Sequence, residues 1–243
     1  MKCTLKKTVL ASFLEALTPI VTDCRAVIDD QGISVRAVCT ANVSLVAATL
    51  PREAFVTMDE TGASELVGLE VSKILTAVNM VDDADDAVTL EKIVDDPQIY
   101  ITGPGVKYTW RTIDPHVLKK QPNPPSILLP TKVTMNATAF KKAVDKIRKV
   151  GDKIRFVTDG DAKFSLEGYG DDNKVALTLD ADVMGPAASS LYSLDYVASM
   201  AKVIAKADNT VTIKIGVDHP VILEFERDGG EYLYMLAPRI EAE

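Results

Sequence analysis

The feature that most constrains the fold of this chain is an internal repeat. Residues 88–115 and 211–238 align without a gap at an offset of 123, and 7 of the 28 aligned positions are identical. Both stretches alternate short apolar runs with turn residues, and each ends in a proline. This pattern predicts strand, turn, strand, turn and strand in both copies, because glycine, proline and aspartate between β-prone runs favour turns.

The similarity continues towards the N-terminal side of each stretch. A short amphipathic segment, predicted to be a helix, precedes both strand regions at residues 69–80 and 194–207. Further upstream, Phe13 and Phe140 each lead another predicted helix that runs into a pair of strands. Chance similarity of two β-rich stretches is the alternative, and the agreement of the helix positions argues against it. We therefore predict an α+β fold of two tandem similar domains, each of about 115 to 120 residues with antiparallel sheets and two helices.

A proline-rich segment separates the two copies. It reads "HVLKKQPNPPSILLP" and contains Pro122, Pro124, Pro125 and Pro130. Proline prevents regular helix and disfavours a central strand, so an extended connector is expected. The predicted organisation is a first domain at 1–116, a connector at 117–130 and a second domain at 131–243.

The charge of the chain is unevenly distributed. Its net charge is −8, which taken alone argues against nucleic acid as a partner. Residues 141–155, however, hold seven Lys or Arg against two Asp. On a helical wheel, basic side chains of three predicted helices lie away from the apolar face. These residues are Lys73, Lys142, Lys146, Arg148, Lys149, Lys202 and Lys206.

Two interpretations of these basic helix faces remain open. They are compatible with ordinary solvated helix surfaces. If the helices share one surface, that surface is locally basic on an acidic body. Such a surface would contact DNA phosphates without distinguishing between bases.

Residues that usually carry catalysis or bind metals are scarce. The three cysteines show no metal spacing and fit free thiols in a reducing compartment, and two histidines offer little to a zinc site or a catalytic triad. The acidic run "DDADD" at 82–86 lacks the glycine and the distant glutamate of a calcium loop, so a solvated loop is favoured. "GPGVKY" lacks the third glycine of a dinucleotide fingerprint. We predict no catalytic residue, no metal and no cofactor, and a metal-dependent nucleic-acid hydrolase is only a weak alternative.

No segment is typical of membrane insertion or export. No apolar run approaches the roughly 18 residues that a membrane-spanning helix needs. The N-terminus starts with basic residues, but its apolar positions recur at helical spacing and Glu15 interrupts them. We therefore predict neither a signal peptide nor a membrane partner.

Four short motifs occur in a characteristic order: "NVSLV" at 42–46, "SKIL" at 72–75, "SLDY" at 193–196 and "YMLAPRIE" at 234–241. Together with the repeat and the connector, they resemble the sliding clamp family of archaea and eukaryotes, proliferating cell nuclear antigen, and its archaeal members above all. The resemblance covers the whole chain. It implies a homotrimeric ring of six similar domains, with helices lining the hole, sheets forming the rim, and duplex DNA threaded through without sequence specificity.

The resemblance also implies what such a ring does. It tethers DNA polymerase, the clamp loader, and nucleases or ligases, and it is not itself an enzyme. In an archaeon it would be cytoplasmic and associated with the nucleoid, and in a eukaryote it would be nuclear. A subunit of a heteromeric ring is the alternative, because unlike rings use the same fold and the same edges.

The resemblance further implies a groove for short partner peptides near the C-terminus. The implied groove residues are Asn42, Val43, Leu45, Pro125, Ile127, Pro220, Met235, Ala237, Pro238 and Ile240. Residues 232–236 would then form a strand rather than a frayed end. An apolar groove with free backbone edges suits extended or short helical peptides.

The ring needs an interface between subunits. The resemblance implies that the strand around 106–112 pairs with the strand at 174–180 of the next subunit, in a head-to-tail contact that can close. The implied interface residues are Tyr108, Trp110, Val175, Leu177 and Leu179. For Trp110, ordinary core packing is an equal alternative.

Overall fold

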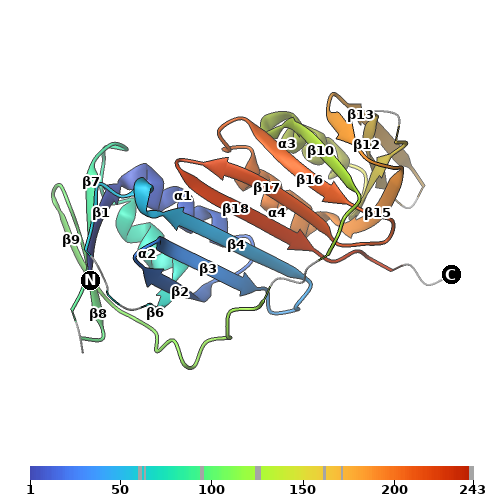
Figure 1. The fold of residues 1–243 in the computed structure, drawn as a ribbon. Coiled ribbons are helices and arrows are strands. Elements are labelled where there is room, and N and C mark those ends of the chain that lie inside the picture. Colours follow the sequence, from blue (N-terminus) through green and yellow to red (C-terminus); the bar gives the residue numbers. More distant parts are fainter. Residues whose placement is uncertain are drawn as a thin grey trace. The chain divides into compact units, whose positions relative to one another are not determined.

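The computed structural model describes residues 1–59, 62, 64–93, 96–123, 127–160, 163–170 and 172–240, and Figure 1 shows its fold. The chain forms two compact units. Unit 1 comprises 1–42, 46–123 and 227–232, and unit 2 comprises 43–45, 124–226 and 233–243. The main division, between residues 123 and 124, falls inside the predicted connector 117–130. Two short segments belong to the unit formed by the other half of the sequence: residues 43–45 cluster with unit 2 and residues 227–232 with unit 1. The sequence analysis did not predict this exchange.

In the first half of the chain, the described residues form three helical segments among nine strands. In order these are β1 (Lys2–Lys6), α1 (Lys7–Leu17), β2 (Asp23–Asp29), β3 (Gly32–Val38), β4 (Ser44–Pro51), the 3-10 helix η1 (Arg52–Ala54), β5 (Thr57–Met58), β6 (Glu65–Glu70), α2 (Val71–Val78), β7 (Ala87–Lys92), β8 (Gln98–Gly103) and β9 (Val106–Arg111).

The second half repeats this order of helices and strands without the 3-10 helix. Its elements are β10 (Thr131–Asn136), α3 (Ala137–Ile147), β11 (Lys153–Thr158), β12 (Phe164–Tyr169), β13 (Lys174–Leu179), β14 (Asp182–Met184), β15 (Ala188–Ser193), α4 (Leu194–Ile204), β16 (Thr210–Ile215), β17 (Val221–Arg227) and β18 (Gly230–Leu236). Among the described residues, no helix is both long and apolar enough to cross a membrane.

The sheets repeat strand for strand. The orders β5-β1-β7-β8-β9 and β4-β3-β2-β6 recur as β14-β10-β16-β17-β18 and β13-β12-β11-β15. The strand pairs resolved residue by residue are antiparallel, for example Cys3 opposite Leu90 in β1 and β7, and Val133 opposite Ile213 in β10 and β16. This correspondence confirms the two tandem similar domains and the antiparallel α+β fold that the sequence predicts.

Each unit has its own core between a helix pair and the sheets. In unit 1, α1 and α2 pack on each other, and the side chains of Leu10, Phe13 and Ile74 are buried against the strands. Figure 1 shows the helices of each unit on one face of its sheets. Burying these faces supplies the main stabilisation of the fold, at about 25 cal/mol per Å² of apolar surface.

The core of unit 2 is built around aromatic rings. α3 and α4 pack together, and the ring of Phe156 meets those of Phe140, Phe164 and Tyr192 edge to face at centroid distances of 6.1, 5.9 and 5.2 Å. All four rings are fully buried. Such edge-to-face pairs stabilise a core by roughly 0.5 to 1.5 kcal/mol each beyond the area they bury.

The structure corrects one detail of the predicted repeat. Phe13 and Phe140 occupy different positions in their two helices. α1 begins at Lys7 and α3 begins at Ala137, so Phe13 is the seventh residue of α1 and Phe140 is the fourth residue of α3. Both helices have 11 residues, so Phe140 corresponds in position to Leu10. An error of three residues is close to one helical turn, and it leaves both phenylalanines on the apolar face.

Candidate nucleic-acid and peptide interfaces

The most basic helical surface belongs to α3 in unit 2. The Oδ1 atom of Asn136 caps the helix by accepting a hydrogen bond from the backbone N–H of Ala139 at 2.9 Å. The apolar face of the helix is buried, as the wheel predicts. The opposite face exposes Lys142 and Lys146, and Arg148 and Lys149, which follow directly after the helix, are exposed as well. The only acidic residue of the helix, Asp145, is bonded to Lys141.

The neighbouring helix α4 adds to this surface. Lys202 on α4 and Lys206 just after it are exposed, and α4 packs directly on α3. Within the described part of the chain, no ion pair engages Lys142, Lys146, Arg148, Lys149 or Lys202. Their charges therefore remain available to an anionic partner. We call Lys142, Lys146, Arg148, Lys149, Lys202 and Lys206 the basic face of unit 2.

The predicted basic residue of α2 lies in a different environment. The Nζ atom of Lys73 lies 2.7 Å from Oε1 of Glu70, the residue that precedes the helix. The other carboxylate oxygen of Glu70 accepts a hydrogen bond from the indole N–H of Trp110 at 3.0 Å. The bond from Lys73, and after it the bond from Trp110, lowers the pKa of Glu70, and the same ion pair raises the pKa of Lys73. The charge of Lys73 is thus balanced within unit 1.

Two further cations at the start of α1 are also engaged. Lys6 pairs with Asp85 at 2.8 Å, and the ammonium group of Lys7 is bonded to the carbonyl oxygen of Val81. The Lys6–Asp85 pair ties part of the "DDADD" run to the start of α1. No group of three or more potential metal ligands occurs among the residues that the structure describes.

The segment that ends the described chain is held in place. β18 confirms the strand predicted for residues 232–236. Beyond it, the N–H of Ala237 donates to the carbonyl oxygen of Val43 at 2.8 Å, and the N–H of Arg239 donates to that of Leu191 at 2.7 Å. The guanidinium of Arg239 also bonds Asp152 at 3.1 Å. These contacts lie within unit 2 and hold Val43 beside the C-terminal segment.

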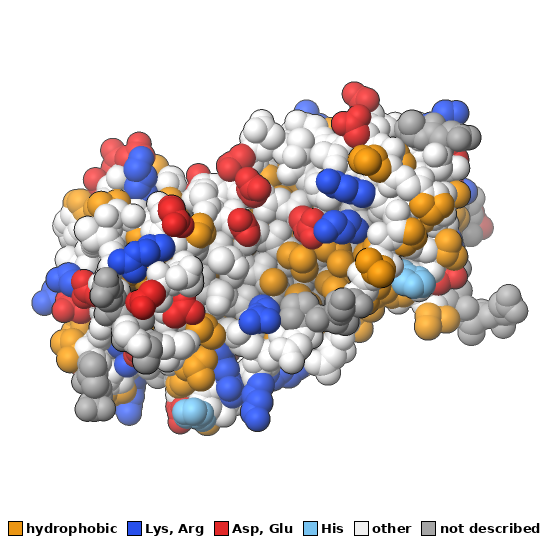
Figure 2. All heavy atoms as spheres, in the orientation of Figure 1, with side chains coloured by type: hydrophobic (Ala, Val, Ile, Leu, Met, Phe, Trp, Pro, Cys, Tyr) orange, Lys and Arg blue, Asp and Glu red, His pale blue; other side chains and the backbone are white. Residues whose placement is uncertain are grey.

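The predicted groove residues differ strongly in exposure. Val43 is 38% and Ile240 is 92% exposed, whereas Leu45 and Met235 are buried. The remaining members Ile127, Pro220, Ala237 and Pro238 are half-buried, and Pro125 lies outside the described residues. On the face drawn in Figure 2, hydrophobic side chains gather over the C-terminal half near the end of β18. The exposed apolar surface of the predicted groove is therefore carried mainly by Val43 and Ile240.

Asn42 sets the path of the chain into Val43. Its backbone φ is +58°, a left-handed conformation that asparagine tolerates better than most residues. Its side-chain oxygen accepts a hydrogen bond from Nζ of Lys119 at 3.1 Å. Asn42 therefore acts as a fixed turn before β4, and its exposed side chain is already bonded to the connector.

The two strands predicted to join subunits each lie at the edge of a sheet. β9 has only β8 as a neighbour in sheet order, and β13 has only β12. Tyr108 on β9 is half-buried, as are Val175, Leu177 and Leu179 on β13. Trp110 is buried at 4% exposure and bonded to Glu70, so its side chain packs in the core of unit 1, as the alternative interpretation held.

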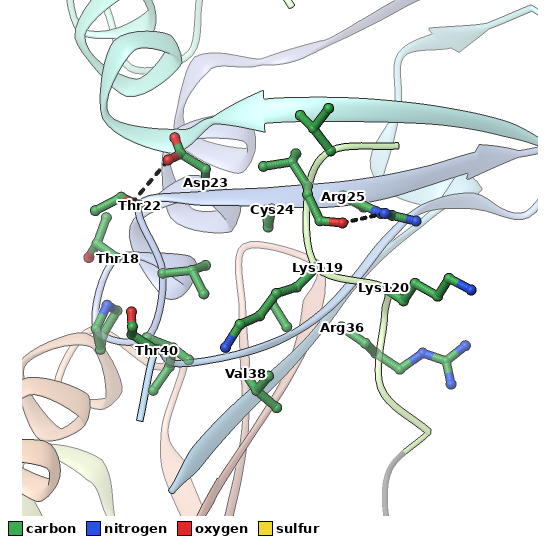
Figure 3. A pocket seen from close by; sticks show the side chains of 16 residues that line it. Thr18, Thr22, Asp23, Cys24, Arg25, Arg36, Val38, Thr40, Lys119 and Lys120 are labelled. Carbon is green, nitrogen blue, oxygen red and sulfur yellow. Dashed lines mark hydrogen bonds between the residues drawn. The ribbon is translucent and has the colours of Figure 1, made fainter. Parts of the chain in front are cut away.

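A pocket in unit 1 escaped the sequence analysis. It has a volume of about 410 Å3 and is lined by the end of α1, by β2 and β3, and by the start of the connector. Figure 3 shows that it gathers four cations, Arg25, Arg36, Lys119 and Lys120. The adjacent lysines in "VLKKQ" were a signal for it, but the partners from β2 and β3 are brought in only by folding.

Comparisons with known proteins agree with one another. Residues 3–100 match the family described as "Proliferating cell nuclear antigen, N-terminal domain". The "DNA polymerase sliding clamp" of Methanospirillum hungatei is 34% identical over 250 aligned positions, which cover 100% of both chains. The solved structure "C-terminal region of FEN-1 bound to A. fulgidus PCNA" matches with a TM-score of 0.90 and 29% identity, over 100% of this chain and 99% of that chain.

A heteromeric assembly has the same fold. In the structure of a PCNA2–PCNA3 complex from Sulfolobus tokodaii, the matching chain has a TM-score of 0.86 and 22% identity, over 99% of this chain and 100% of that one. The duplicated α+β architecture thus defines a clamp-fold protein. The chain belongs to the DNA polymerase sliding clamp family, proliferating cell nuclear antigen, and the relatives it matches over its full length include archaeal members.

Proposed function

We propose that this protein is a DNA sliding clamp, a non-enzymatic processivity factor that forms a homotrimeric ring around duplex DNA. Its full-length similarity to proteins named DNA polymerase sliding clamp supports this function. The ring would tether DNA polymerase and other replication and repair proteins, and a clamp loader would place it on DNA. Since its relatives are archaeal, we propose a cytoplasmic, nucleoid-associated location.

The observation that carries the proposal is the pair of free sheet edges. By the repeat, β9 is the counterpart of β18, and β13 is the counterpart of β4. β18 and β4 are hydrogen-bonded neighbours, and in unit 1 the first residues of β18 cluster with β4. Their counterparts β9 and β13 have no such partner among the described residues of the chain, and each lies at the edge of its sheet. A head-to-tail contact of β9 with β13 of the next copy would therefore reuse a pairing that the sequence already forms.

The basic face of unit 2 would face the DNA. Its cations are exposed and make no base-reading arrangement, which suits phosphate contacts that a sliding ring needs. An overall net charge of −8 would meanwhile discourage DNA from binding elsewhere on the ring.

The C-terminal segment of unit 2 would receive partner peptides. Val43 and Ile240 offer exposed apolar surface beside a backbone held by bonds to Val43 and Leu191. A solved relative carries the C-terminal region of FEN-1. We therefore propose that a nuclease, a ligase or a polymerase docks here through a short peptide with aliphatic and aromatic anchors.

The mass in solution tests the ring. Three chains of 26.3 kDa make about 79 kDa, and we expect this species by sedimentation or light scattering across a range of concentrations. A monomer at every concentration would overturn the homotrimer and favour a heteromeric ring, which a second, unlike clamp subunit should restore on mixing.

A single substitution tests the edge itself. The N–H of Thr112 points towards the β8 side, because it donates to the carbonyl oxygen of Pro97, the residue before β8, at 2.8 Å. Backbone N–H groups alternate in direction along a strand, so the N–H of Thr109 points away from β8. Thr109→Pro would remove this outward donor while leaving the β8 pairing intact. We expect Thr109→Pro to be monomeric and Thr109→Ala to remain trimeric. A trimeric, folded Thr109→Pro variant would contradict the proposed interface.

A further inference from the structure

The pocket of unit 1 has a preformed wall of positive charge. Arg25 on β2 donates through Nη2 to the carbonyl oxygens of His116, at 3.2 Å, and Leu118. Its own carbonyl oxygen accepts a bond from the side chain of Gln121 at 3.0 Å. These bonds fix the start of the connector against β2. The pocket is therefore formed before any ligand arrives, which lowers the entropic cost of binding.

The four cations of the pocket are not neutralised by carboxylates within the described residues. Arg25 and Lys119 donate only to uncharged oxygens, the latter to the carbonyl of Cys39 at 3.3 Å and the amide of Asn42 at 3.1 Å. Arg36 and Lys120 are exposed and have no bonded partner in the part of the chain that the structure describes. Figure 3 shows the side chains of Arg36 and Lys120 projecting to the same side as Arg25.

The rest of the lining is mixed in character. Ile20, Cys24 and Ala37 are buried at the floor, and Val117 at the rim is 74% exposed. Burial, with a smaller effect of the charge of Asp23, raises the pKa of the Cys24 thiol to about 12, so the thiol stays protonated and unreactive at neutral pH. The pocket thus offers cations and apolar contacts, but no nucleophile.

We propose that this pocket binds an acidic peptide segment that carries apolar side chains, supplied by a protein that uses the clamp. The inference rests on the proposed function for the identity of such partners. Carboxylates would pair with Arg36 and Lys120, and an aliphatic side chain would cover Val117. A volume of about 410 Å3 exceeds what one inorganic anion fills and lies in the range of about 300 to 1,000 Å3 typical of ligand sites.

Duplex DNA fits this pocket less well than an acidic peptide. Unlike such a peptide, DNA offers no aliphatic side chain to cover Val117, which lies in the lining and is exposed. The cations of the pocket stand on β2, β3 and the connector, whereas the proposed DNA contacts stand on α3 and α4. The two basic surfaces therefore serve different anions.

The test compares two labelled peptides, ELEEVEEL and QLQQVQQL, by fluorescence anisotropy at low salt with the full-length protein. We expect the acidic peptide to bind and the glutamine peptide to bind at least tenfold more weakly. The double variant Arg36→Gln/Lys120→Gln should lower affinity for the acidic peptide about tenfold, because two unscreened charge pairs are lost. Equal binding of both peptides, or no effect of the variant, would overturn the proposal.

A matched control is Lys132→Gln/Lys163→Gln, which removes two exposed cations of unit 2 and leaves the net charge the same as in the test variant. The control variant should bind the acidic peptide within twofold of wild type. A tenfold loss of affinity in this control would show that the effect of Arg36→Gln/Lys120→Gln comes from the net charge of the protein, and it would overturn the proposal. If Arg36→Gln/Lys120→Gln weakens duplex DNA as much as the acidic peptide, the surface is a phosphate contact and the peptide assignment fails.

A second competitor separates this proposal from the proposed function. An excess of the FEN-1 C-terminal peptide should leave ELEEVEEL bound, since that peptide is expected at the C-terminal segment of unit 2. Displacement would put both ligands in one groove and overturn the pocket assignment. Failure of the FEN-1 peptide to bind, with ELEEVEEL still sensitive to Arg36→Gln/Lys120→Gln, would count against the proposed groove alone and support the pocket.

Discussion

The helical surfaces of the two units use their cations in opposite ways. On α3 and α4, the exposed Lys142, Lys146 and Lys202 have no counter-ion within the described residues, and the half-buried Lys141 pairs with Asp145. On the unit 1 side, Lys6 and Lys73 are held by Asp85 and Glu70. Two copies of one architecture therefore present different electrostatic surfaces, although their helices have the same place in the fold.

The difference teaches how a duplicated fold can divide its tasks. A phosphate that approaches Lys73 must first displace the carboxylate of Glu70, and the gain from the new pair is offset by the loss of the old one. A phosphate that approaches Lys142 or Lys146 displaces only water and counterions. DNA contact is thus expected to depend mainly on unit 2, three times around the proposed ring.

The largest effect is expected when the basic face of unit 2 is removed. The triple variant Lys142→Gln/Lys146→Gln/Lys149→Gln should lower affinity for duplex DNA about tenfold or more at low salt. The slope of log affinity against log salt should flatten by about 2 to 3, because each lost phosphate contact contributes roughly 0.9. Anisotropy of a labelled duplex over a salt series measures both.

The triple variant should keep the wild-type mass and its affinity for the FEN-1 peptide, since its side chains are exposed and outside the core. An unchanged salt slope in a protein of normal mass would show that α3 does not contact phosphates. The comparison between the units would then lose its functional meaning.

Local patterns in the sequence were enough to predict the fold and the basic face. The aligned repeat correctly placed β7 and β8 in the first copy and β16 and β17 in the second, because short strands and their turns are determined by adjacent residues. Helical periodicity separated Phe140 and Val144 from Lys142 and Lys146 for the same reason.

Contacts between distant segments were beyond such patterns. Glu70 contacts Lys73, three residues away, and also Trp110, which is 40 residues away in the sequence. Only the first of these contacts is local. The pocket cations come from two strands and the connector. The exchange of residues 43–45 and 227–232 between units depends on how β4 and β18 pair, and no periodicity within one segment reports that.

A smaller effect is expected from the cap of α3. Asn136 accepts a hydrogen bond from Ala139, whereas Ser193, which precedes α4, makes no such side-chain bond. Asn136→Ala should lower the free energy of unfolding by about 1 kcal/mol, because a helix N–H loses its acceptor. Ser193→Ala is the matched control and should change it much less. Denaturant unfolding of both variants measures this difference. Equal losses of unfolding free energy in the two variants would mean that the hydrogen bond to Asn136 does not stabilise the helix.

The smallest expected effect is a gain of function in unit 1. Glu70→Gln would release the charge of Lys73 while the amide oxygen can still accept the bond from Trp110. We expect affinity for duplex DNA to rise by about twofold at low salt, in line with one modest surface pair, and the double variant Glu70→Gln/Lys73→Gln to cancel the gain.

The pH dependence sharpens this last prediction. The pKa of Glu70 is lowered and that of Lys73 is raised in the folded protein, so both groups stay charged and paired between the ordinary glutamate value of about 4.3 and the alkaline range where lysine loses its proton. On the acid side, the pair is lost as the pH falls through the lowered pKa of Glu70. The gain from Glu70→Gln should therefore be the same at pH 6 and pH 8. A gain that disappears between these values, or one that survives Lys73→Gln, would mean that Lys73 is not the group that Glu70 withholds from DNA.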